Sequence, residues 1–263
     1  MEARTSVGKK DKEKGPEKPR ETTVEFLASL AGVLVTGLFI ITFVLQAFVI
    51  PSSSMEDTLL IGDHVFVNRV AFSPPTRWIG PVLPYAHPHR GDIVVFLSMD
   101  PRTPDLNIVK RIIGIPGDRI HLRDGVVYRN GERLTEPYVK HAGFSYNPYR
   151  DNFPTVPPLD DPNVIDDWKL TMGSHIENGE IVVPPDSYFG MGDNRDVSED
   201  SRYWGFISQD HLIGRPMFVY WSFETPESQY LQTGMGDRLK FMAHVVIHFF
   251  DQTRWRRTFR PVH

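Results

Sequence analysis

The longest uncharged stretch of the chain lies near its N-terminus. No charged residue occurs from Phe26 to Met55, and the sequence FLASLAGVLVTGLFIITFVLQAFVI fills residues 26–50. A helix needs about 20 apolar residues to cross a bilayer, whereas the apolar region of a cleavable signal peptide has roughly 7–15. A buried helix of a soluble protein would rarely lack charge over such a length. The stretch therefore predicts one uncleaved transmembrane helix over residues 26–50.

Residues 1–25, which precede this helix, form a polar tail. The tail carries seven basic residues, nearly balanced by acidic ones, and has nothing to bury, so we expect it to be disordered. Basic residues close to a span keep that end in the cytoplasm, and the first basic residue after the span is Arg69. The N-terminus is therefore expected in the cytoplasm, with residues 51–263 on the opposite side of the membrane.

Beyond the apolar helix, the hydrophobic pattern changes to a period of two residues. Segments rich in β-branched and aromatic residues are bounded by glycine and proline, which is typical of strands joined by turns. Asn130-Gly131, between two apolar segments, is a hairpin signal. These patterns predict a mainly β, antiparallel domain over residues 51–225. The predicted strands lie at 64–72, 92–97, 107–115, 119–134 and 216–223.

Two segments depart from the strand pattern. Residues 135–180 are rich in proline, with Tyr, Asn and Asp between, and predict an inserted loop-rich β lobe rather than core. Residues 226–263 form an amphipathic and basic segment, in which an apolar run at 239–250 is too short to span a bilayer. The basic and aromatic run 254–260 follows it. An interfacial position at anionic lipid and a terminal helix packed on the core both remain open.

Composition narrows the possible chemistry. The 263 residues suffice for one large domain or two modest ones. The net charge of −4 gives no reason to expect nucleic-acid binding, and the absence of cysteine excludes thiol catalysis and disulfides. His87 and His89 lack a third ligand nearby, which zinc requires, and the turn at 193–196 lacks the spacing of a calcium loop. We expect neither a metal nor another cofactor.

Three separate stretches of the chain carry short, distinctive motifs. They are Ile50-Pro51-Ser52-Ser53-Ser54-Met55 with Thr58-Leu59 and Gly62-Asp63; Gly91 to Val94 with Val109 to Asp118; and Gly192 to Asp196 with Ser198, Asp200 to Arg202 and Trp204-Gly205. Together, and in the same order along the chain, they resemble the bacterial type I signal peptidases, and with the apolar helix the resemblance spans roughly residues 26–222. This resemblance implies a serine endopeptidase of the bacterial plasma membrane, with its catalytic domain on the extracytoplasmic side.

The resemblance also implies a role for individual residues. Ser54 would be the nucleophile and Lys110 its general base, with no cofactor. Type I signal peptidases commonly have glycine where this chain has Ser53, and proline where it has Asp57. The implied supporting residues are Ser52, which would add its hydroxyl to an oxyanion hole beside the Ser54 amide; Ser198, which would orient the lysine; and Asp200 with Arg202, which would form an ion pair.

Physical chemistry sets a condition on this assignment. A serine hydroxyl needs a neighbouring base, and lysine, with a pKa near 10.4 in water, acts as a base only when burial lowers that pKa. Lys110 lies in the apolar segment 108–113, where burial is plausible. Taken alone, it could equally be a snorkelling strand residue, and Ser52 to Ser54 could simply cap a helix. The family motif, matched immediately before Met55, selects Ser54 and the dyad.

The resemblance further predicts the substrate and how it binds. We expect preprotein signal peptides, cut after small residues of the Ala-x-Ala type, which bind extended along an exposed strand edge near 92–97. Membrane lipid is the other expected partner, and the protein should be a monomer. The substrate-binding residues are expected to be Ile50, Pro51, Met55, Asp92, Ile93 and Val94.

Two other functions are compatible with the sequence. One is a Ser-Lys protease dedicated to a single secretion or conjugation substrate. The other is a non-catalytic, membrane-tethered β scaffold that binds export clients. Replacement of Ser54 by alanine separates the enzymes from the scaffold, and the breadth of preproteins cleaved separates the two enzymes.

Overall fold

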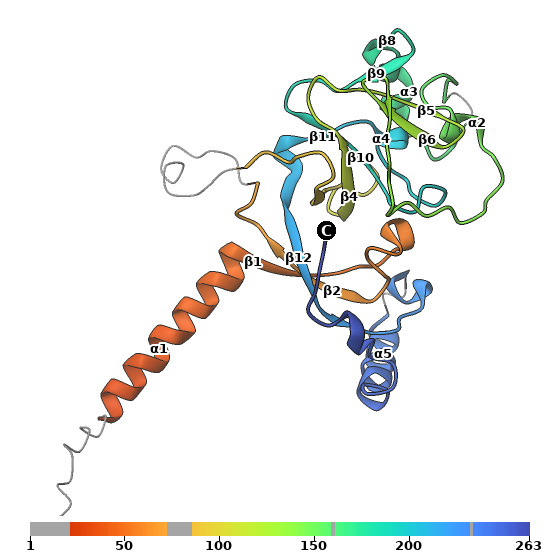
Figure 1. Ribbon diagram of the computed structural model, residues 1–263. Coiled ribbons are helices and arrows are strands. Elements are labelled where there is room, and N and C mark those ends of the chain that lie inside the picture. Colours follow the sequence, from red (N-terminus) through yellow and green to blue (C-terminus); the bar gives the residue numbers. More distant parts are fainter. Residues whose placement is uncertain (1–21, 73–85, 159–160, 232–233) are drawn as a thin grey trace, which may run out of the picture. The chain divides into compact units, whose positions relative to one another are not determined.

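The computed structural model (Figure 1) describes residues 22–72, 86–158, 161–231 and 234–263. The chain divides into two compact units, Met1–Ile40 and Ile41–His263. The apolar helix α1 (Thr23–Phe39) continues into one turn of π-helix, Ile40–Val44. Within the described ranges, Thr23–Val44 is the one helix that is long and apolar enough to cross a membrane.

Both ends of this helix differ from the predicted span of residues 26–50. At its start, the Thr22 hydroxyl accepts a hydrogen bond from the Glu25 amide, and the Glu25 carboxylate accepts one from the Thr22 amide. This capping box begins the helix inside the predicted tail, and the rest of that tail, residues 1–21, lies outside the described residues. At its other end, Leu45–Val49 pairs with a neighbouring strand. Apolar composition alone cannot distinguish such a strand from more helix, so the predicted end at residue 50 is wrong.

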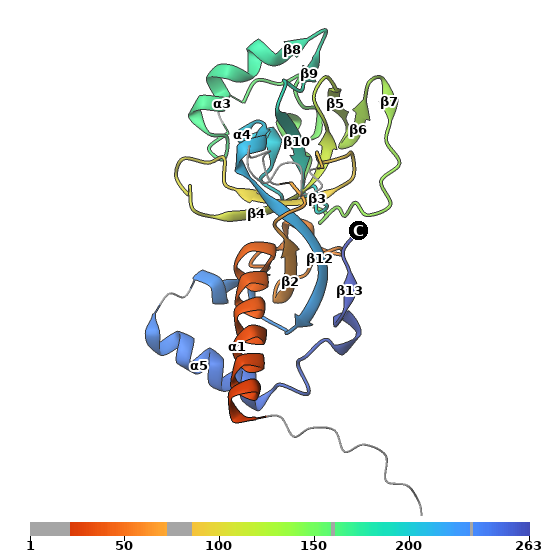
Figure 2. The same ribbon diagram turned by 90° about the vertical axis from the view of Figure 1, so that its left-hand side faces the viewer.

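The main sheet of the second unit has eight strands and is antiparallel, as predicted. Its order is β1-β2-β12-β3-β4-β10-β11, with β13 paired to β12. Figure 2 shows the long strand β12 curving along the domain. The strands are β1 (Leu45–Val49), β2 (Asp63–Asn68), β3 (Ile93–Leu97), β4 (Asn107–Gly114), β10 (Ser187–Met191), β11 (Ile207–Ser208), β12 (Leu212–Ser222) and β13 (Arg260–Pro261).

Strand β3 separates two hydrophobic cores. Successive side chains of a strand point to opposite faces, so Ile93 and Val95 belong to one core, while Val94 and Phe96 belong to the other. All four side chains are buried. The near-continuous apolar run of this segment is therefore explained by a sheet that is covered on both faces.

A smaller sheet of five strands contains the predicted hairpin. Asn130 and Gly131 have φ values of 53° and 80°, as a turn with two left-handed residues requires. The sheet has the order β7-β6-β5-β9-β8. Its strands are β5 (Arg119–Arg123), β6 (Val126–Arg129), β7 (Glu132–Arg133), β8 (Ile176–Glu177) and β9 (Glu180–Val182).

The segment 135–180 is not a lobe apart from the core, contrary to the sequence interpretation. Tyr149, Phe153 and Trp168 are buried in the same cluster as Phe96 and Phe189 of the main sheet. Prolines interrupt regular structure in this segment, but its aromatic residues still supply core. The short helices here and nearby are α2 (Pro148–Asp151), α3 (Asp166–Thr171), α4 (Ser201–Trp204) and the 3₁₀ turns Met172–His175 and Gln209–His211.

The C-terminal segment contains one longer helix and then returns to the main sheet. Arg257 is buried and contacts both carboxylate oxygens of Asp63, at 3.1 and 2.5 Å. Strand β13 adds main-chain pairing to β12. The segment is thus part of the domain, through the elements η5 (Glu227–Leu231), α5 (Met235–Ile247), the 3₁₀ turn Trp255–Arg257 and β13.

Candidate active site

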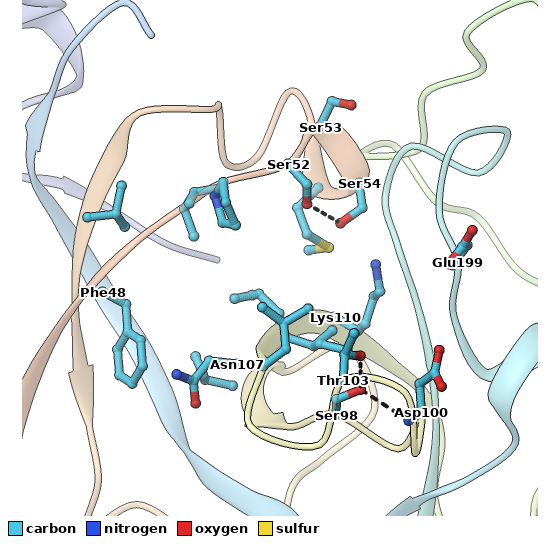
Figure 3. A pocket seen from close by; sticks show the side chains of 18 of the residues that line it. Phe48, Ser52, Ser53, Ser54, Ser98, Asp100, Thr103, Asn107, Lys110 and Glu199 are labelled. Atoms are coloured by element: carbon cyan, nitrogen blue, oxygen red, sulfur yellow. Dashed lines mark hydrogen bonds between the residues drawn. The ribbon is translucent and has the colours of Figure 1, made fainter. Parts of the chain in front are cut away.

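An open cleft of about 590 Å³ lies between two strands of the main sheet. One wall is the chain from Phe48 to Met55, and the other is the chain from Asn107 to Lys110. Figure 3 shows Ser54 and Lys110 from these two walls facing the same space. The structure therefore brings together the two residues that the sequence interpretation had assigned to catalysis, which are 56 positions apart in the chain.

Ser54 lies in a short 3₁₀ turn, Ser53–Met55, that follows β1. Its carbonyl oxygen accepts a hydrogen bond from the Asn194 amide at 3.1 Å, which ties the turn to a distant loop. The hydroxyls of Ser52 and Ser54 lie 3.5 Å apart, whereas the hydroxyl of Ser53 points elsewhere and donates to Glu227 at 3.3 Å. All three adjacent serines line the cleft, but only the hydroxyls of Ser52 and Ser54 lie near each other on the side where Figure 3 shows Lys110.

The backbone after the turn Ser53–Met55 has an unusual conformation at Asp57. Its φ is 78°, in the left-handed region, whereas the ring of proline fixes φ near −65°. The proline that the family resemblance led us to expect at this position could not adopt this backbone. Lys140 lies beside the turn and pairs with Glu56 at 3.0 Å and with Asp57 at 3.6 Å.

Lys110 is carried by β4, opposite Val94 of β3, and only 3% of its surface is exposed. Burial lowers the pKa of Lys110 to about 8, because the ammonium loses its hydration there. The Asp200 carboxylate opposes this shift, and the Arg202 guanidinium adds to it. No hydrogen bond joins Lys110 to Ser54 or to Ser198 among the described residues. Such bonds are often long or absent before substrate binds.

Asp200 and Arg202 form the ion pair that the resemblance implied. The guanidinium donates to both carboxylate oxygens at 2.8 Å, and both side chains are fully buried. Burial by itself would raise the pKa of Asp200, but the charge and hydrogen bonds of Arg202 lower it below its ordinary value. The Asp200 carboxylate also accepts the Gly192 amide at 3.1 Å, so the pair fixes the loop beneath the cleft.

Ser198 lies next to Gly192, close to the turn that carries Ser54. A side chain at Gly192 would collide with the Ser198 hydroxyl and with the Ser54 carbonyl oxygen, so only glycine allows these segments to meet. The Ser198 hydroxyl is buried and has no hydrogen-bond partner in the described part of the chain. A buried hydroxyl without a partner is costly, and this one has capacity left for a neighbouring amine.

A second buried ion pair supports the same turn and was not assigned a role from the sequence. Arg111 donates to both oxygens of Asp193, at 2.8 and 2.7 Å, and Thr58 donates to Asp193 at 2.6 Å. The Arg111 guanidinium also lies 3.8 Å from the centre of the Tyr138 ring. Arg111 directly follows Lys110, and Asp193 directly precedes Asn194, within the motifs that carry the family resemblance. Their position in these motifs could have marked both residues as parts of the site. The turn at 193–196 is held by hydrogen bonds and shapes the site.

The predicted substrate residues divide into two groups. Ile50, Pro51 and Met55 line the cleft, whereas Asp92, Ile93 and Val94 do not. Ile93 and Val94 are core residues of an interior strand, and Asp92 pairs with Arg215 at 2.5 Å. The prediction that substrate pairs with a strand edge near 92–97 is therefore wrong. β3 is an interior strand, because β4 pairs along all of it on one side and β12 pairs with Val95 and Phe96 on the other.

The free strand edges beside the cleft belong to β1 and β4. β1 is the outermost strand of the main sheet and pairs with β2 alone among the described strands. On the side that faces β10, β4 is paired only from Arg111 onward, which leaves Asn107–Lys110 open on that side. Both free edges line the cleft, so an extended chain has two places to pair. Among the described residues, no group of three or more His, Cys, Asp or Glu is placed to hold a metal.

An antiparallel β fold that places a serine opposite a buried lysine in an open cleft defines a candidate serine hydrolase. Comparison with known proteins identifies the family. The model of the family "Signal peptidase, peptidase S26" matches residues 23–221. The chain therefore belongs to the signal peptidase family, peptidase S26, and is a serine endopeptidase. This family membership excludes the non-catalytic scaffold.

Individual relatives agree with the family match. A probable signal peptidase I-2 of Synechocystis sp. is 32% identical over 206 residues, covering 77% of this chain and 75% of that protein. Signal peptidase I of Aquifex aeolicus is 30% identical over 224 residues, covering 74% and 82%. The crystal structure of a signal peptidase I from Enterococcus faecalis is 30% identical and covers 49% of this chain and 97% of its own, with a TM-score of 0.32.

Proposed function

We propose that this protein cleaves signal peptides from exported preproteins, with Ser54 as nucleophile and Lys110 as general base. The observation that carries the proposal is the placement of both side chains in one cleft, with Lys110 buried so that its pKa falls to about 8. At pH 7 about a tenth of the amine is then uncharged, whereas an exposed lysine would be almost wholly protonated.

The reaction follows from these positions. Lys110 takes the proton of the Ser54 hydroxyl while the Ser54 oxygen attacks the scissile carbonyl carbon. The developing oxyanion is stabilised by the Ser54 amide and the Ser52 hydroxyl. Collapse of this intermediate breaks the peptide bond, and the Lys110 ammonium gives its proton to the leaving amine. A water molecule, deprotonated by the same lysine, then attacks the acyl carbon. The ester bond to Ser54 breaks, and the Lys110 ammonium returns the proton to the Ser54 oxygen. Ser198 orients the lysine through these steps.

The substrate is proposed to bind as an extended strand between the free edges of β1 and β4. Main-chain hydrogen bonds to both edges supply affinity without regard to sequence, whereas side chains on alternate residues enter the cleft. Apolar residues, among them Ile50 and Met55, line that cleft. Cleavage after small residues of the Ala-x-Ala type, which the family resemblance implies, is part of this proposal.

The location of the site fits a substrate held in a membrane. Ser54 follows Val44, the last residue of the apolar helix, by only ten residues. We propose that the helix anchors the enzyme in a bacterial plasma membrane, with a cytoplasmic N-terminus and residues 51–263 on the extracytoplasmic side as a monomer. A signal peptide carries its cleavage site just beyond its own apolar segment, so both partners meet at the same depth.

A cleavage assay with several preproteins tests the function. Wild-type protein in detergent micelles should cleave each preprotein once, after a small residue, and Ser54→Ala should leave no turnover above background. Ser53→Ala is the matched control, because its hydroxyl points to Glu227, and it should stay within about tenfold of wild type. Full activity of Ser54→Ala would refute the nucleophile, and cleavage of one preprotein alone would favour the dedicated maturation protease.

A further inference from the structure

Helix α5 (Met235–Ile247) has two apolar faces, of which only one is covered. On the inner face, the rings of Phe241 and His244 lie 6.3 and 6.0 Å from that of Phe223, at the end of the sheet. On the outer face, a row of apolar side chains is 57–76% exposed. A helix that only covers a domain needs one apolar face. The exposed row consists of Met235, Leu239, Met242 and Val246, spaced at intervals of four, three and four residues.

The exposed row continues beyond the end of the helix. Ile247 extends it, and Phe250 is 81% exposed. The rings of Phe250 and Trp255 stack at 6.3 Å, and the Trp255 indole donates to the Phe250 carbonyl at 3.1 Å. We name these side chains the α5 stripe: Met235, Leu239, Met242, Val246, Ile247, Phe250 and Trp255. So many neighbouring exposed apolar side chains indicate an interaction surface.

Basic residues accompany the stripe. Residues 234–263 contain six Lys and Arg against two Asp and Glu. Arg238, Arg256 and Arg260 are exposed and form no ion pair within the described residues. Apolar side chains with Trp beside unpaired arginines are the composition of helices that lie in the interface of anionic bilayers. The surface therefore complements lipid in both its apolar and its charged parts.

A bilayer fits this surface better than a second copy of the chain does. A two-fold dimer formed through the stripe would bring the same unpaired arginines together, and like charges at an interface repel. A bilayer is also the partner at hand if the proposed anchoring is right, because β1 begins at Leu45, directly after the apolar helix. No linker separates the domain from the span, so its effective concentration at the lipid surface is high.

We propose that the α5 stripe lies in the interface of an anionic membrane and gives the catalytic domain a second attachment besides the anchor. This proposal rests on the proposed membrane anchoring but not on the cleavage reaction. The stripe lies beyond residue 221, where the family match ends. A single attachment allows a domain to rotate relative to the membrane, whereas two attachments fix its tilt. The anchor and the α5 stripe together would therefore keep the cleft oriented toward signal peptides in the same membrane.

The absence of cysteine makes a direct test possible. Single-cysteine variants Val246→Cys and Ile247→Cys of the full chain are labelled with an environment-sensitive fluorophore. Leu170→Cys on α3, which is 84% exposed, serves as the control. The proteins are reconstituted in phosphatidylcholine vesicles with and without phosphatidylglycerol. Labels at 246 and 247 should shift to the blue and be quenched by spin-labelled lipid, more strongly with phosphatidylglycerol, and the label at 170 should not.

The alternatives give different results in this experiment. Emission at 246 that matches emission at 170 in both vesicle types would overturn the proposal. Shielding of 246 that rises with the protein-to-lipid ratio, without quenching by spin-labelled lipid, would instead reveal contact between copies and also overturn it. Because the readout is fluorescence, these results do not depend on whether the protein cleaves signal peptides.

A functional comparison then measures the consequence of lipid contact. The double variant Val246→Glu/Ile247→Glu should cleave a soluble signal-sequence peptide as wild type does, because neither residue lines the cleft. Its cleavage of a preprotein embedded in phosphatidylglycerol-containing vesicles should fall by at least about threefold, because orientation at the membrane is lost. Equal losses on both substrates would show a structural defect rather than lost lipid contact, and no loss on either would contradict the orienting role.

Discussion

Two buried cationic side chains near the cleft, Lys110 on β4 and Arg202 on α4, differ in their partners and in their charge. Both side chains are almost fully buried, at 3% and 1% exposure. Arg202 makes two hydrogen bonds to Asp200 and keeps its charge, whereas Lys110 has no carboxylate within ion-pair distance in the described structure, and burial lowers its pKa to about 8. Burial with a matched partner makes a fixed charge that organises the loop. Burial without such a partner leaves an amine that is able to act as a base near neutral pH.

The largest expected effect comes from removing that base. Lys110→Met should reduce kcat by at least about 10⁴-fold, as loss of a member of a catalytic dyad does, while the fold survives. The assay is preprotein cleavage in detergent, with Lys169→Met as the control. Turnover within tenfold of wild type would remove Lys110 from the role of base.

The same variant should also be more stable than wild type. Since the pKa of Lys110 falls from 10.5 in the unfolded chain to about 8 in the fold, the folded protein binds this proton less tightly than the unfolded chain does. This costs about 3 kcal/mol at any pH below about 8, and the cost fades as the pH rises toward 10.5. Thermal unfolding at pH 7 should therefore show a higher Tm for Lys110→Met, with a difference that shrinks toward pH 10.

Breaking the other buried site should destabilise the protein. Asp200→Asn leaves the Arg202 guanidinium buried without its counter-charge, which costs about 3–5 kcal/mol. It also weakens the hold on the Gly192 amide beneath the cleft. Denaturant unfolding in detergent measures the loss, and Asp166→Asn, at an exposed pair with Lys169, is the matched control with a change below about 1 kcal/mol. Equal stability of the two variants would mean that the buried Asp200–Arg202 pair contributes no more to stability than the exposed Asp166–Lys169 pair does.

A smaller effect is expected from Glu199, a carboxylate of the cleft that acts on the charge of Lys110. Glu199 lines the cleft beside Lys110, and its carboxylate raises the pKa of Lys110. Glu199→Gln should therefore shift the acid limb of the kcat/KM profile to lower pH by a fraction of a unit. Glu227→Gln, another carboxylate of the cleft, is the control and should leave the limb unchanged. A shift to higher pH for Glu199→Gln would contradict the prediction that the Glu199 carboxylate raises the pKa of Lys110.

The sequence predicted the interior of this molecule better than its edges. The period-two pattern located β3, β4 and the Asn130-Gly131 hairpin, because local turn chemistry and burial on a sheet leave clear marks. It placed residues 45–49 in the helix, since an apolar strand and an apolar helix look alike until a partner strand is known. It also missed that Tyr149 and Trp168 enter the core from a proline-rich segment. The effect of a proline on the backbone can be predicted from the local sequence, whereas the packing of an aromatic ring depends on residues far away in the chain.

The site shows the same division. The motifs selected Ser54 and Lys110, and both line the cleft. The substrate edge was assigned to the wrong strand, because an apolar run such as 93–96 reads equally well as an edge or an interior strand. Strand order, which distinguishes β1 and β4 from β3, depends on pairings between residues more than a hundred positions apart, such as β12 with β2. No pattern within one segment reports those pairings.

The proposed mechanism depends most on the charge of the Lys110 amine, which can be titrated directly. Carbon-13 labelling of the lysine ε-carbons, with the Lys110→Met spectrum to assign the signal, gives the pKa of this one residue by NMR. We expect a midpoint of about 8 for Lys110, well below that of the exposed lysines. A midpoint of about 10 or above, equal to that of the other lysines, would mean that the amine stays charged and cannot act as the base.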